Sequence, residues 1–568
     1  LVFAGDVTRA EADANEGRLC YPGTLDTAGV EGKIVLCLRG VIARTDKSLA
    51  VQQAGGVGMV LANTGPTESL NGDFHSIPSI HVNSANGAGL QAYIANGTDP
   101  TAIIGAGVSA IVEASEVAGF SSRGPALAGN GDILKPDIMA PGVDVIAAVS
   151  PAGYNGNNFD ALSGTSMSSP HMAGLGALMK QRYPNWSPAA IKSAFMTTAT
   201  QSTNQGNPIA GGPFGYGAGF VVPNRATNPG LVYDAGFDDW LAFLCGTGQL
   251  TATYCSRLAI DPSDLNYPSI AVGALVGSQT VTRTVTNVGE AASYVASIEL
   301  PGFTASVSPS NLSLAKGERA EYTVTLTNES APLNSYASGA IIWEDGSGNS
   351  VRSPIVVRPV EIDAPAAVSG TGVTGSVSFD VSFGYSGDYA ALPRGLAAAN
   401  TFEGNVVDDP ANDINTALVT DVGITVHPVA VPAGTVYQRF ALFDDYTDGN
   451  DDLDLYVFGP SGYVGGSGSA TSAEQVDVEN PDAGTYFVVV HGWETDGPDA
   501  NYTLFSWSVG ADEGNMSITA PNAAVVGTSG SVTVEWNGLD EETKYLGRIS
   551  HQNGTGEIAH TLFSVETD

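Results

Sequence analysis

A serine at the start of an apolar helix is the residue of this sequence best suited to chemistry. Residues 163–174 read SGTSMSSPHMAG, and an apolar stretch continues from Ser166 to Met179. The first N–H groups of a helix have no partner inside it and lie at the positive end of its dipole. They can therefore stabilise negative charge that develops beside Ser166. The pattern indicates nucleophilic attack by Ser166 on a carbonyl group.

The partners that such a nucleophile needs are absent from the sequence around it. A serine requires a general base, which is oriented in turn by a third group. His171 lies five positions along the same helix, so it projects from a different face and is predicted to be a packed residue. Before Ser166 the sequence offers only His75 and His81, in a strand-like segment where neither is expected to act as the base.

Two apolar helices must position the nucleophile. The helix that begins near Ser166 is too apolar for a surface helix, which predicts that it is buried. Gly174 and Gly176 lower its helix propensity, and we expect a neighbouring backbone to approach closely there. The second helix has Ser187 as its N-cap, followed by a proline, and ends near Thr198.

A chain of 568 residues is expected to form several domains, and changes in the residue pattern along it indicate where they divide. Short β-like runs alternate with Gly-rich turns before about residue 112, which indicates a small α/β lobe. Period-two runs without a convincing helix follow residue 261 and are typical of β-sandwiches. The predicted domains are residues 1–112 (α/β lobe), 113–260 (helical segment with the nucleophile), 261–360 (β-sandwich), 361–375 (linker rich in Ala, Gly and Thr), 376–510 (second β domain) and 511–568 (a further β module).

The composition excludes some classes of partner. Acidic residues outnumber basic ones by 59 to 22, which gives a formal net charge of -37. Such a surface repels phosphates, so nucleic acid is not an expected partner. No apolar run approaches the ~18 residues of a membrane span, and the first residues do not resemble a signal peptide. We expect that the true N-terminus is missing.

Four cysteines are too few for a disulfide scaffold, but their spacing pairs them locally. Cys20 lies near Cys37, and Cys245 lies near Cys255. If both pairs are bonded, they place the protein in an oxidising compartment. The alternative is that all four are free buried thiols.

The segment around Ser166 resembles the nucleophile motif of the subtilases, Gly-Thr-Ser-Met-x-x-Pro-His-x-Ala-Gly, at every defined position. Further segments resemble the plant-type branch of this family, and the likeness extends over residues 1 to about 360. These segments are 120–125 (FSSRGP), 135–142 (KPDIMAPG), 183–188 (YPNWSP), 230–234 (GLVYD), 264–269 (DLNYPS), 283–289 (RTVTNVG) and 351–355 (VRSPI).

The resemblance implies a multidomain protein in which a partial α/β subtilisin-type core carries a protease-associated (PA) insert and is followed by β-sandwich domains. Residues 1–112 then correspond to the PA insert, and residues 261–360 correspond to a fibronectin-III-like domain. The family also bonds cysteines at places similar to the two local pairs. In subtilisin the triad order is Asp, His, Ser, and neither the Asp and His motifs nor the oxyanion Asn motif precedes Ser166. We therefore expect a missing N-terminal catalytic segment.

Residues 376–510 resemble, more loosely, the bacterial pre-peptidase C-terminal domain, through 452–457 (DLDLYV) and 483–490 (AGTYFVVV). Some such domains bind calcium, and carboxylates are the ligands that Ca²⁺ prefers. The spacing fails the EF-hand pattern, so a structural Ca²⁺ and a merely solvated acidic turn both remain open. The candidate ligands are Asp444, Asp445, Asp448, Asp451, Asp452 and Asp454.

The function expected from these observations is a secreted serine endopeptidase that hydrolyses protein or peptide substrates through an acyl-enzyme on Ser166. No cofactor is expected for catalysis. The chain alone is predicted to be inactive, since the catalytic Asp, His and oxyanion Asn are not in it. The alternative is a secreted binding or adhesion protein built of β modules, in which the protease segment is vestigial.

Overall fold

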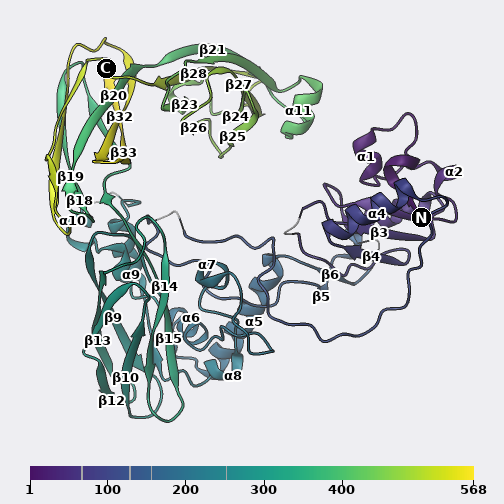
Figure 1. Ribbon diagram of the computed structural model, residues 1–568, viewed down its shortest axis with the longest axis horizontal. Coiled ribbons are helices and arrows are strands. Elements are labelled where there is room, and N and C mark those ends of the chain that lie inside the picture. Colours follow the sequence, from purple (N-terminus) through teal and green to yellow (C-terminus); the bar gives the residue numbers. More distant parts are fainter. Residues whose placement is uncertain (66–67, 127–128, 155, 251–252, 568) are drawn as a thin grey trace. The chain divides into compact units, whose positions relative to one another are not determined.

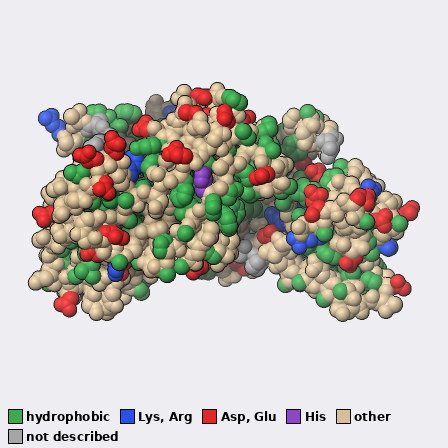
Figure 2. All heavy atoms as spheres, turned by 90° about the horizontal axis from the view of Figure 1, so that it is seen from above, with side chains coloured by type: hydrophobic (Ala, Val, Ile, Leu, Met, Phe, Trp, Pro, Cys, Tyr) green, Lys and Arg blue, Asp and Glu red, His purple; other side chains and the backbone are tan. Residues whose placement is uncertain are grey.

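The structure, a computed structural model, describes residues 1–65, 68–126, 129–154, 156–250 and 253–567 (Figure 1). These residues form two compact units. The first comprises Leu1–Gly273, Thr280–Ala331 and Tyr336–Arg358, and the second comprises Ala274–Gln279, Pro332–Ser335 and Pro359–Asp568. Among the described residues, no helix has both the length and the apolarity needed to cross a membrane. On the face drawn in Figure 2, acidic side chains are scattered among other residue types.

The N-terminal lobe of the first unit is a parallel sheet in the order β1-β2-β3-β4, with helices packed against it. Successive side chains of a strand point to opposite faces. Val35 and Met59 therefore enter one core, and Leu36 and Val60 enter the other. The predicted α/β lobe is confirmed. Its elements are β1 (Val2–Phe3), η1 (Ala4–Val7), α1 (Ala14–Arg18), α2 (Thr27–Val30), β2 (Ile34–Leu38), α3 (Arg44–Gln53), β3 (Gly58–Ala62), β4 (Ser79–Val82) and α4 (Ser84–Asn96).

Both cysteine pairs are bonded in the predicted way. The Cys20–Cys37 bond fastens the loop after α1 to strand β2, and the Cys245–Cys255 bond joins α9 to α10. No cysteine of the chain is free, so the alternative of buried thiols is wrong.

In the described part of the segment from 113 to 260, helices predominate over strands. Its second long helix, α6, begins as predicted, because the Ser187 side chain accepts a hydrogen bond from the Ala190 N–H at 2.9 Å and Pro188 occupies the first helical position. Nearly all of α6 is buried. The elements here are β5 (Val145–Ala148), η2 (Pro151–Gly153), β6 (Phe159–Leu162), α5 (Thr165–Arg182), α6 (Pro188–Thr197), α7 (Gly212–Tyr216), α8 (Pro223–Ala226), β7 (Leu231–Val232), α9 (Phe237–Gly246), α10 (Cys255–Leu258) and η3 (Pro262–Asp264).

The burial predicted for α5 is wrong. Met179 is its only buried residue, and Leu178 is 62% exposed. The helix packs one face on the core next to α6, through Met172 and Leu175, while no described element covers its other face. A Cβ atom built at Gly174 or at Gly176 would meet no atom within 4 Å. The close backbone approach predicted at these glycines is therefore also absent.

Residues 264–360 form a β-sandwich, as predicted for 261–360. Its sheets have the orders β12-β10-β14-β15-β8 and β11-β13-β9-β7 (Figure 1), so β7, which precedes the domain, joins the second sheet. Trp343 and Tyr322 fill the core between them. The strands are β8 (Ile270–Leu275), β9 (Ser278–Asn287), β10 (Ala292–Glu299), β11 (Phe303–Ser308), β12 (Asn311–Leu314), β13 (Arg319–Asn328), β14 (Ala337–Glu344) and β15 (Ser350–Pro359).

The second unit contains two further sandwiches, of which the first is built from both ends of the unit. Strands of residues 362–398 pair with strands of residues 516–567 in the sheets β16-β18-β31-β29 and β17-β33-β32-β20. The small sheet β19-β30 completes it. The strands are β16 (Ile362–Asp363), β17 (Ala367–Thr371), β18 (Gly375–Phe383), β19 (Gly387–Asp388), β20 (Ala390–Ala398), β29 (Met516–Thr519), β30 (Ala523–Ala524), β31 (Ser529–Trp536), β32 (Thr543–Asn553) and β33 (Gly556–Thr567).

Two of the predicted domain assignments are therefore wrong. Residues 361–375 are not a linker, because they contain β16 and β17, and residues 376–398 share a fold with 511–568 rather than with 400–510. No residue of β17 is buried, and the partner strand β33 lies almost two hundred residues away. The sequence near β17 therefore gives no sign that these residues form a strand. Their Ala-, Gly- and Thr-rich composition alone is typical of a linker.

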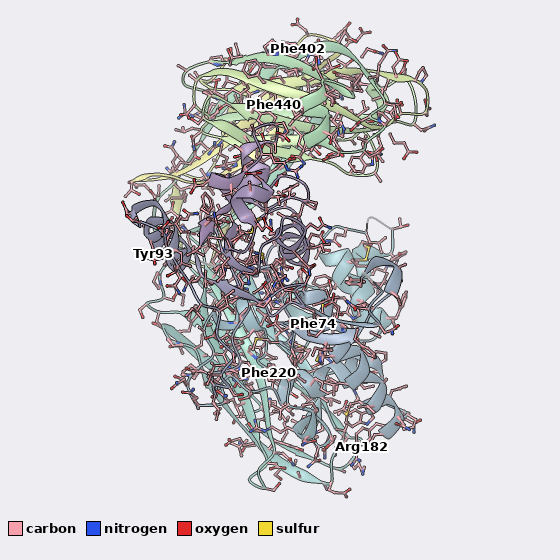
Figure 3. All side chains as sticks on the ribbon, turned by 90° about the vertical axis from the view of Figure 1, so that its right-hand side faces the viewer. Phe74, Tyr93, Arg182, Phe220, Phe402 and Phe440 are labelled. Atoms are coloured by element: carbon pink, nitrogen blue, oxygen red, sulfur yellow. A yellow bond between two sulfur atoms is a disulfide. The ribbon has the colours of Figure 1, made fainter. Side chains whose placement is uncertain are left out.

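The other sandwich of the second unit lies between these two halves in the sequence. Its sheets are β21-β28-β23-β26 and β22-β27-β24-β25, and Phe440, labelled in Figure 3, is fully buried in its core. The elements are β21 (Asn400–Val407), α11 (Ile414–Thr420), β22 (Ile424–Val431), β23 (Tyr437–Ala441), η4 (Asp444–Tyr446), β24 (Asp452–Gly459), β25 (Gly462–Ser467), β26 (Gln475–Glu479), β27 (Gly484–Glu494) and β28 (Asp499–Val509).

The strand pairing makes a prediction about truncation. A chain that ends at Gly510 loses β31 and β33, the partners of β18 and β17, so we expect residues 362–398 to unfold and become sensitive to protease. Limited proteolysis with mass spectrometry measures this. A chain that ends at Arg358 is the control and should keep the protease resistance of the first unit. Equal protection of residues 362–398 with and without residues 511–568 would contradict the pairing.

Candidate active site

Ser166 is the second residue of α5, and its side chain is exposed. The helix has no side-chain cap, because its N-cap residue is Gly164. The Gly164 carbonyl accepts the Met167 N–H at 3.0 Å and the Ser168 N–H at 3.4 Å. The amides of Thr165 and Ser166 precede these and have no acceptor within the helix. An exposed hydroxyl thus lies beside free N–H groups at the positive end of a helix of 18 residues.

A close backbone contact fixes this helix start. The Gly164 N–H donates to the Gly142 carbonyl at 2.8 Å, and the Ser168 hydroxyl donates to the Ala140 carbonyl at 3.0 Å. A Cβ atom at Gly142 would lie 2.9 Å from the Gly164 oxygen and 3.2 Å from the Ser168 Cβ. Only glycine fits there without a shift, which explains the Pro-Gly at the end of the segment 135–142.

Asp144 adds a second contact, which the sequence analysis did not identify. Its N–H donates to the Ser163 Oγ at 2.9 Å, and the Ser163 hydroxyl donates to Asp144 Oδ1 at 3.1 Å. Asp144 has a positive φ of 53°, a left-handed conformation that Asp tolerates better than most residues. The only local signal is an aspartate directly before an apolar run, which does not distinguish this role.

None of the histidines is hydrogen-bonded to Ser166 in the part of the chain that the structure describes. The His171 Nδ1 lies 2.8 Å from the Met167 carbonyl of its own helix, so His171 is a packed helix residue, as predicted. His75 and His81 lie in the N-terminal lobe, where their ring nitrogens contact Ser48 and Asn63. Among the described residues, the Ser166 hydroxyl thus lies beside free N–H groups without a hydrogen-bonded histidine.

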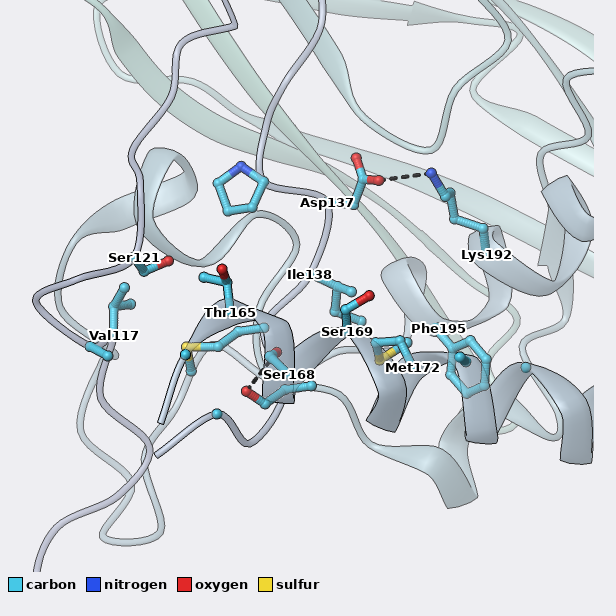
Figure 4. A pocket seen from close by; sticks show the side chains of 18 of the residues that line it. Val117, Ser121, Asp137, Ile138, Thr165, Ser168, Ser169, Met172, Lys192 and Phe195 are labelled. Carbon is cyan, nitrogen blue, oxygen red and sulfur yellow. Dashed lines mark hydrogen bonds and ion pairs between the residues drawn. The ribbon is translucent and has the colours of Figure 1, made fainter. Parts of the chain in front are cut away.

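A groove of about 830 Å³ runs along α5 (Figure 4). Thr165, Ser168 and Ser169 line it near the helix start, and Met172 and Phe195 make it apolar further along. Ser166 itself is not among the lining residues. The groove therefore runs along the side of the helix that carries Met172, next to the core, and not beside Ser166.

A half-buried carboxylate with two lysines borders this groove. Asp137 accepts hydrogen bonds from Lys135 at 2.7 Å, from Lys192 at 2.8 Å and from the Tyr267 hydroxyl at 2.7 Å. Burial alone would raise the pKa of Asp137, but the ammonium groups of Lys192 and Lys135 outweigh it and hold this pKa below its usual value. Tyr267 lies just before β8, so the cluster joins the helical segment to the sandwich that follows.

Models of four domain families match the chain. The subtilase model covers residues 63–217 and therefore the whole nucleophile motif. Residues 63–217 are thus similar to the subtilase family. The PA domain model covers residues 3–90, the fibronectin type-III domain model covers 264–357, and the bacterial pre-peptidase C-terminal domain model covers 424–492. The PA and subtilase matches overlap over 63–90, a stretch that contributes β4 and the first part of α4 to the N-terminal lobe.

Curated proteins similar to this chain include two from a plant. Subtilisin-like protease SBT1.7 from Arabidopsis thaliana is 42% identical over 392 residues, which is 63% of this chain and 51% of the relative. Subtilisin-like protease SBT5.3 from the same plant is 41% identical over 377 residues, 61% of this chain and 49% of the relative. The chain thus spans about half the length of these relatives. Among solved structures, tripeptidyl peptidase 2 aligns with 63% of this chain and 27% of its own, at 14% identity and a TM-score of 0.22.

The six carboxylates considered as calcium ligands do not form one set. Asp444 and Asp445 are exposed in η4, and Asp448 is bonded to the Asn501 backbone N–H and side chain at 2.7 and 2.5 Å. Asp454 lies 3.5 Å from the buried His491 ring. No group of three or more His, Cys, Asp or Glu side chains within the described residues could hold a metal ion. The calcium site stays a prediction.

The Asp137 cluster makes a prediction about stability. Asp137→Asn leaves two ammonium groups without a carboxylate, so we expect it to destabilise the first unit by about 1–3 kcal/mol. The depressed pKa means that the carboxylate stabilises the fold above its unfolded pKa of about 4, and that this stabilisation is lost as the pH falls through the folded pKa. Denaturation at several pH values should show a deficit near neutrality that shrinks below about pH 4. Asp238→Asn, at an exposed carboxylate, is the control. A deficit that does not change with pH would contradict the charge pairing.

Calcium removal gives a second prediction. Asp451 Oδ2 and Asp452 Oδ1 are buried and have no hydrogen-bond partner among the described residues, and a cation would relieve that cost. We expect millimolar CaCl₂ to raise the thermal midpoint of the second unit by several degrees relative to EDTA. Asp451→Asn should reduce the shift, whereas Asp380→Asn, on another sandwich, should not. An unchanged midpoint would identify a merely solvated acidic turn.

Proposed function

We propose that this chain is part of a secreted serine endopeptidase in which Ser166 is the nucleophile. The observation that carries the proposal is the exposed Ser166 hydroxyl at the first turn of α5, within a subtilase-family segment. The contacts at Gly142 and Ser168 hold that turn in place, so the hydroxyl and the free amides keep a fixed relation to each other. Protein or peptide chains are the proposed substrates.

The proposed chemistry is acyl transfer. The Ser166 Oγ forms a bond to the scissile carbonyl carbon while a general base takes its proton, and the carbonyl oxygen becomes an oxyanion. The Ser166 amide at the positive helix end is placed to stabilise that oxyanion. Collapse of the intermediate breaks the C–N bond, the base returns the proton to the leaving amine, and water then releases the acyl group by the reverse sequence.

We also propose that the catalytic Asp, His and oxyanion Asn belong to a segment that precedes residue 1 in the full-length protein, and that the present chain alone is inactive. Three observations support this. The chain spans about half of its curated relatives, no histidine contacts Ser166 within the described residues, and the outer face of α5 is apolar but exposed. The groove along α5 offers a place where such a segment would pack.

The proposed location is extracellular. Both cysteine pairs are bonded, and such bonds persist in oxidising compartments. The alternative function, a secreted adhesion protein with a vestigial protease segment, has support only from the number of β-sandwiches. An intact first turn at α5 favours the enzyme.

A fluorophosphonate probe tests the proposal. We expect the product of the full-length gene to be labelled at Ser166 and to hydrolyse casein, and Ser166→Ala to lower kcat by at least about four orders of magnitude. Ser169→Ala changes an exposed serine of the same helix and should be labelled normally. The 568-residue chain should show neither labelling nor turnover. An unlabelled Ser166 in the full-length protein would favour the adhesion alternative. Turnover by the present chain would overturn the proposal that the catalytic Asp, His and oxyanion Asn lie in a preceding segment.

A further inference from the structure

A polar cavity of about 330 Å³ lies in the N-terminal lobe, away from the groove along α5. Its wall includes Asn71, Gly72 and Asp73, the two lobe histidines, and Asp144 from the segment that precedes β5. Small-molecule sites of proteins are of similar size and place a few polar groups toward their ligand. The proposal of a serine protease assigns no role to this cavity.

Asn71 is the unusual residue of the cavity wall. It is 6% exposed, and neither its Oδ1 nor its Nδ2 has a hydrogen-bond partner among the described residues. A buried amide without partners is costly, and most buried polar groups in proteins are satisfied. The Asn71 backbone is held in place, because its N–H donates to the His81 Nδ1 at 2.9 Å. The unpaired amide is thus fixed in the wall.

The two histidines of the cavity wall differ in how many of their ring nitrogens are already hydrogen-bonded. Since His81 Nδ1 accepts from Asn71, its proton is on Nε2, which donates to Asn63 Oδ1 at 2.7 Å, and both nitrogens are used. The Ser48 hydroxyl donates to the Thr45 carbonyl at 2.7 Å, so at its 3.1 Å contact with His75 Nδ1 it can only accept. His75 therefore carries its proton on Nδ1, and its Nε2, which lies 3.9 Å from Asp73 Oδ2, receives no hydrogen bond from a described residue.

The nearby arginine side chains already donate hydrogen bonds to other residues, whereas one carboxylate has an oxygen that accepts none. Arg44 binds both oxygens of Asp73 at 2.6 and 2.8 Å. Arg39 donates to Asn63 Oδ1 and to the Ser69 carbonyl. Asp144 Oδ1 accepts the Gly72 N–H at 2.9 Å and the Ser163 hydroxyl, but no described residue donates to its Oδ2. The open positions of the cavity are therefore mainly acceptors.

We propose that this cavity binds a guanidinium group, as carried by an arginine side chain of a peptide. A guanidinium is planar, always charged and has five N–H donors. The cavity offers it three acceptors without a donor of their own, which are Asp144 Oδ2, Asn71 Oδ1 and His75 Nε2. A metal ion fits less well, since no group of three or more His, Cys, Asp or Glu side chains in the described lobe could hold one.

The cavity is joined to the nucleophile loop by one carboxylate. Asp144 contributes Oδ2 to the cavity, while its Oδ1 and N–H bond Ser163, three residues before Ser166. An occupant of the cavity therefore contacts the group that holds the start of the turn at Gly164. This link follows from the contacts alone and does not depend on whether the full-length protein is a protease.

Calorimetric titration of the 568-residue chain tests the proposal. N-acetyl-L-arginine amide should bind with a stoichiometry of one, and the uncharged N-acetyl-L-citrulline amide should bind at least about tenfold more weakly. Agmatine distinguishes the source of the guanidinium. Binding of the blocked arginine as tight as that of agmatine indicates a peptide side chain, and binding of agmatine alone indicates a free small amine and overturns the peptide assignment. Absence of binding by both at about 10 mM overturns the site itself.

Variants locate the site. Asp144→Asn and Asn71→Leu should each weaken binding about tenfold, whereas Asp99→Asn, an exposed carboxylate elsewhere in the lobe, should not change it. Ser163→Ala keeps the cavity and cuts its link to the loop. It should bind the probe normally but lack the ligand-induced increase in hydrogen exchange of residues 160–166 that we expect for the unmodified chain. Equal binding by Asp144→Asn and the unmodified chain, with native circular dichroism for both, would overturn the site.

Discussion

The contact between Gly142 and Gly164 is the constraint on which the candidate active site depends. The two backbones approach so closely that a methyl group at residue 142 would collide with the Gly164 carbonyl. That carbonyl is also the acceptor for the first two bonded amides of α5. The position of the 140–142 loop therefore sets the direction in which the free amides point.

Buried polar groups, rather than apolar contacts alone, join the helical segment to the sandwich that follows it. Arg283 is 3% exposed and donates to the carbonyls of Ser263, Tyr267 and Ser269. Tyr233, which follows β7, is hydrogen-bonded to Tyr322 and Ser353 of the sandwich core. Each of these bonds has a required geometry, and a buried donor left unpaired is costly. This explains why the segments 230–234, 264–269, 283–289 and 351–355 carry specific polar residues far from the nucleophile.

Local signals in the sequence predicted local features well. The Ser187 cap, both cysteine pairs and the position of Ser166 at a helix start each depend on residues no more than 17 positions apart. The exposed face of α5 could not be predicted, because apolar composition shows what a helix can bury but not which elements are present to cover it. The sandwich built from residues 362–398 and 516–567 depends on pairing between distant strands. The cavity at Asn71 was missed for the same reason, since Asp144 reaches it from more than seventy residues away.

The bonds of Asp144 also limit how the N-terminal lobe and the nucleophile loop can influence each other. One carboxylate oxygen is shared between the Gly72 amide and the Ser163 hydroxyl, so the two donors compete for the same charge. A cation at the other oxygen withdraws charge from that shared acceptor and weakens both bonds by a modest amount, because charge-assisted hydrogen bonds depend on the charge of the acceptor. The reciprocal bond from the Asp144 N–H to Ser163 is not affected in this way. The loop would therefore loosen where the Ser163 hydroxyl donates to Asp144, while the bond from the Asp144 N–H to Ser163 holds. Residues 163 and 164 would become more mobile, and α5 would not be displaced.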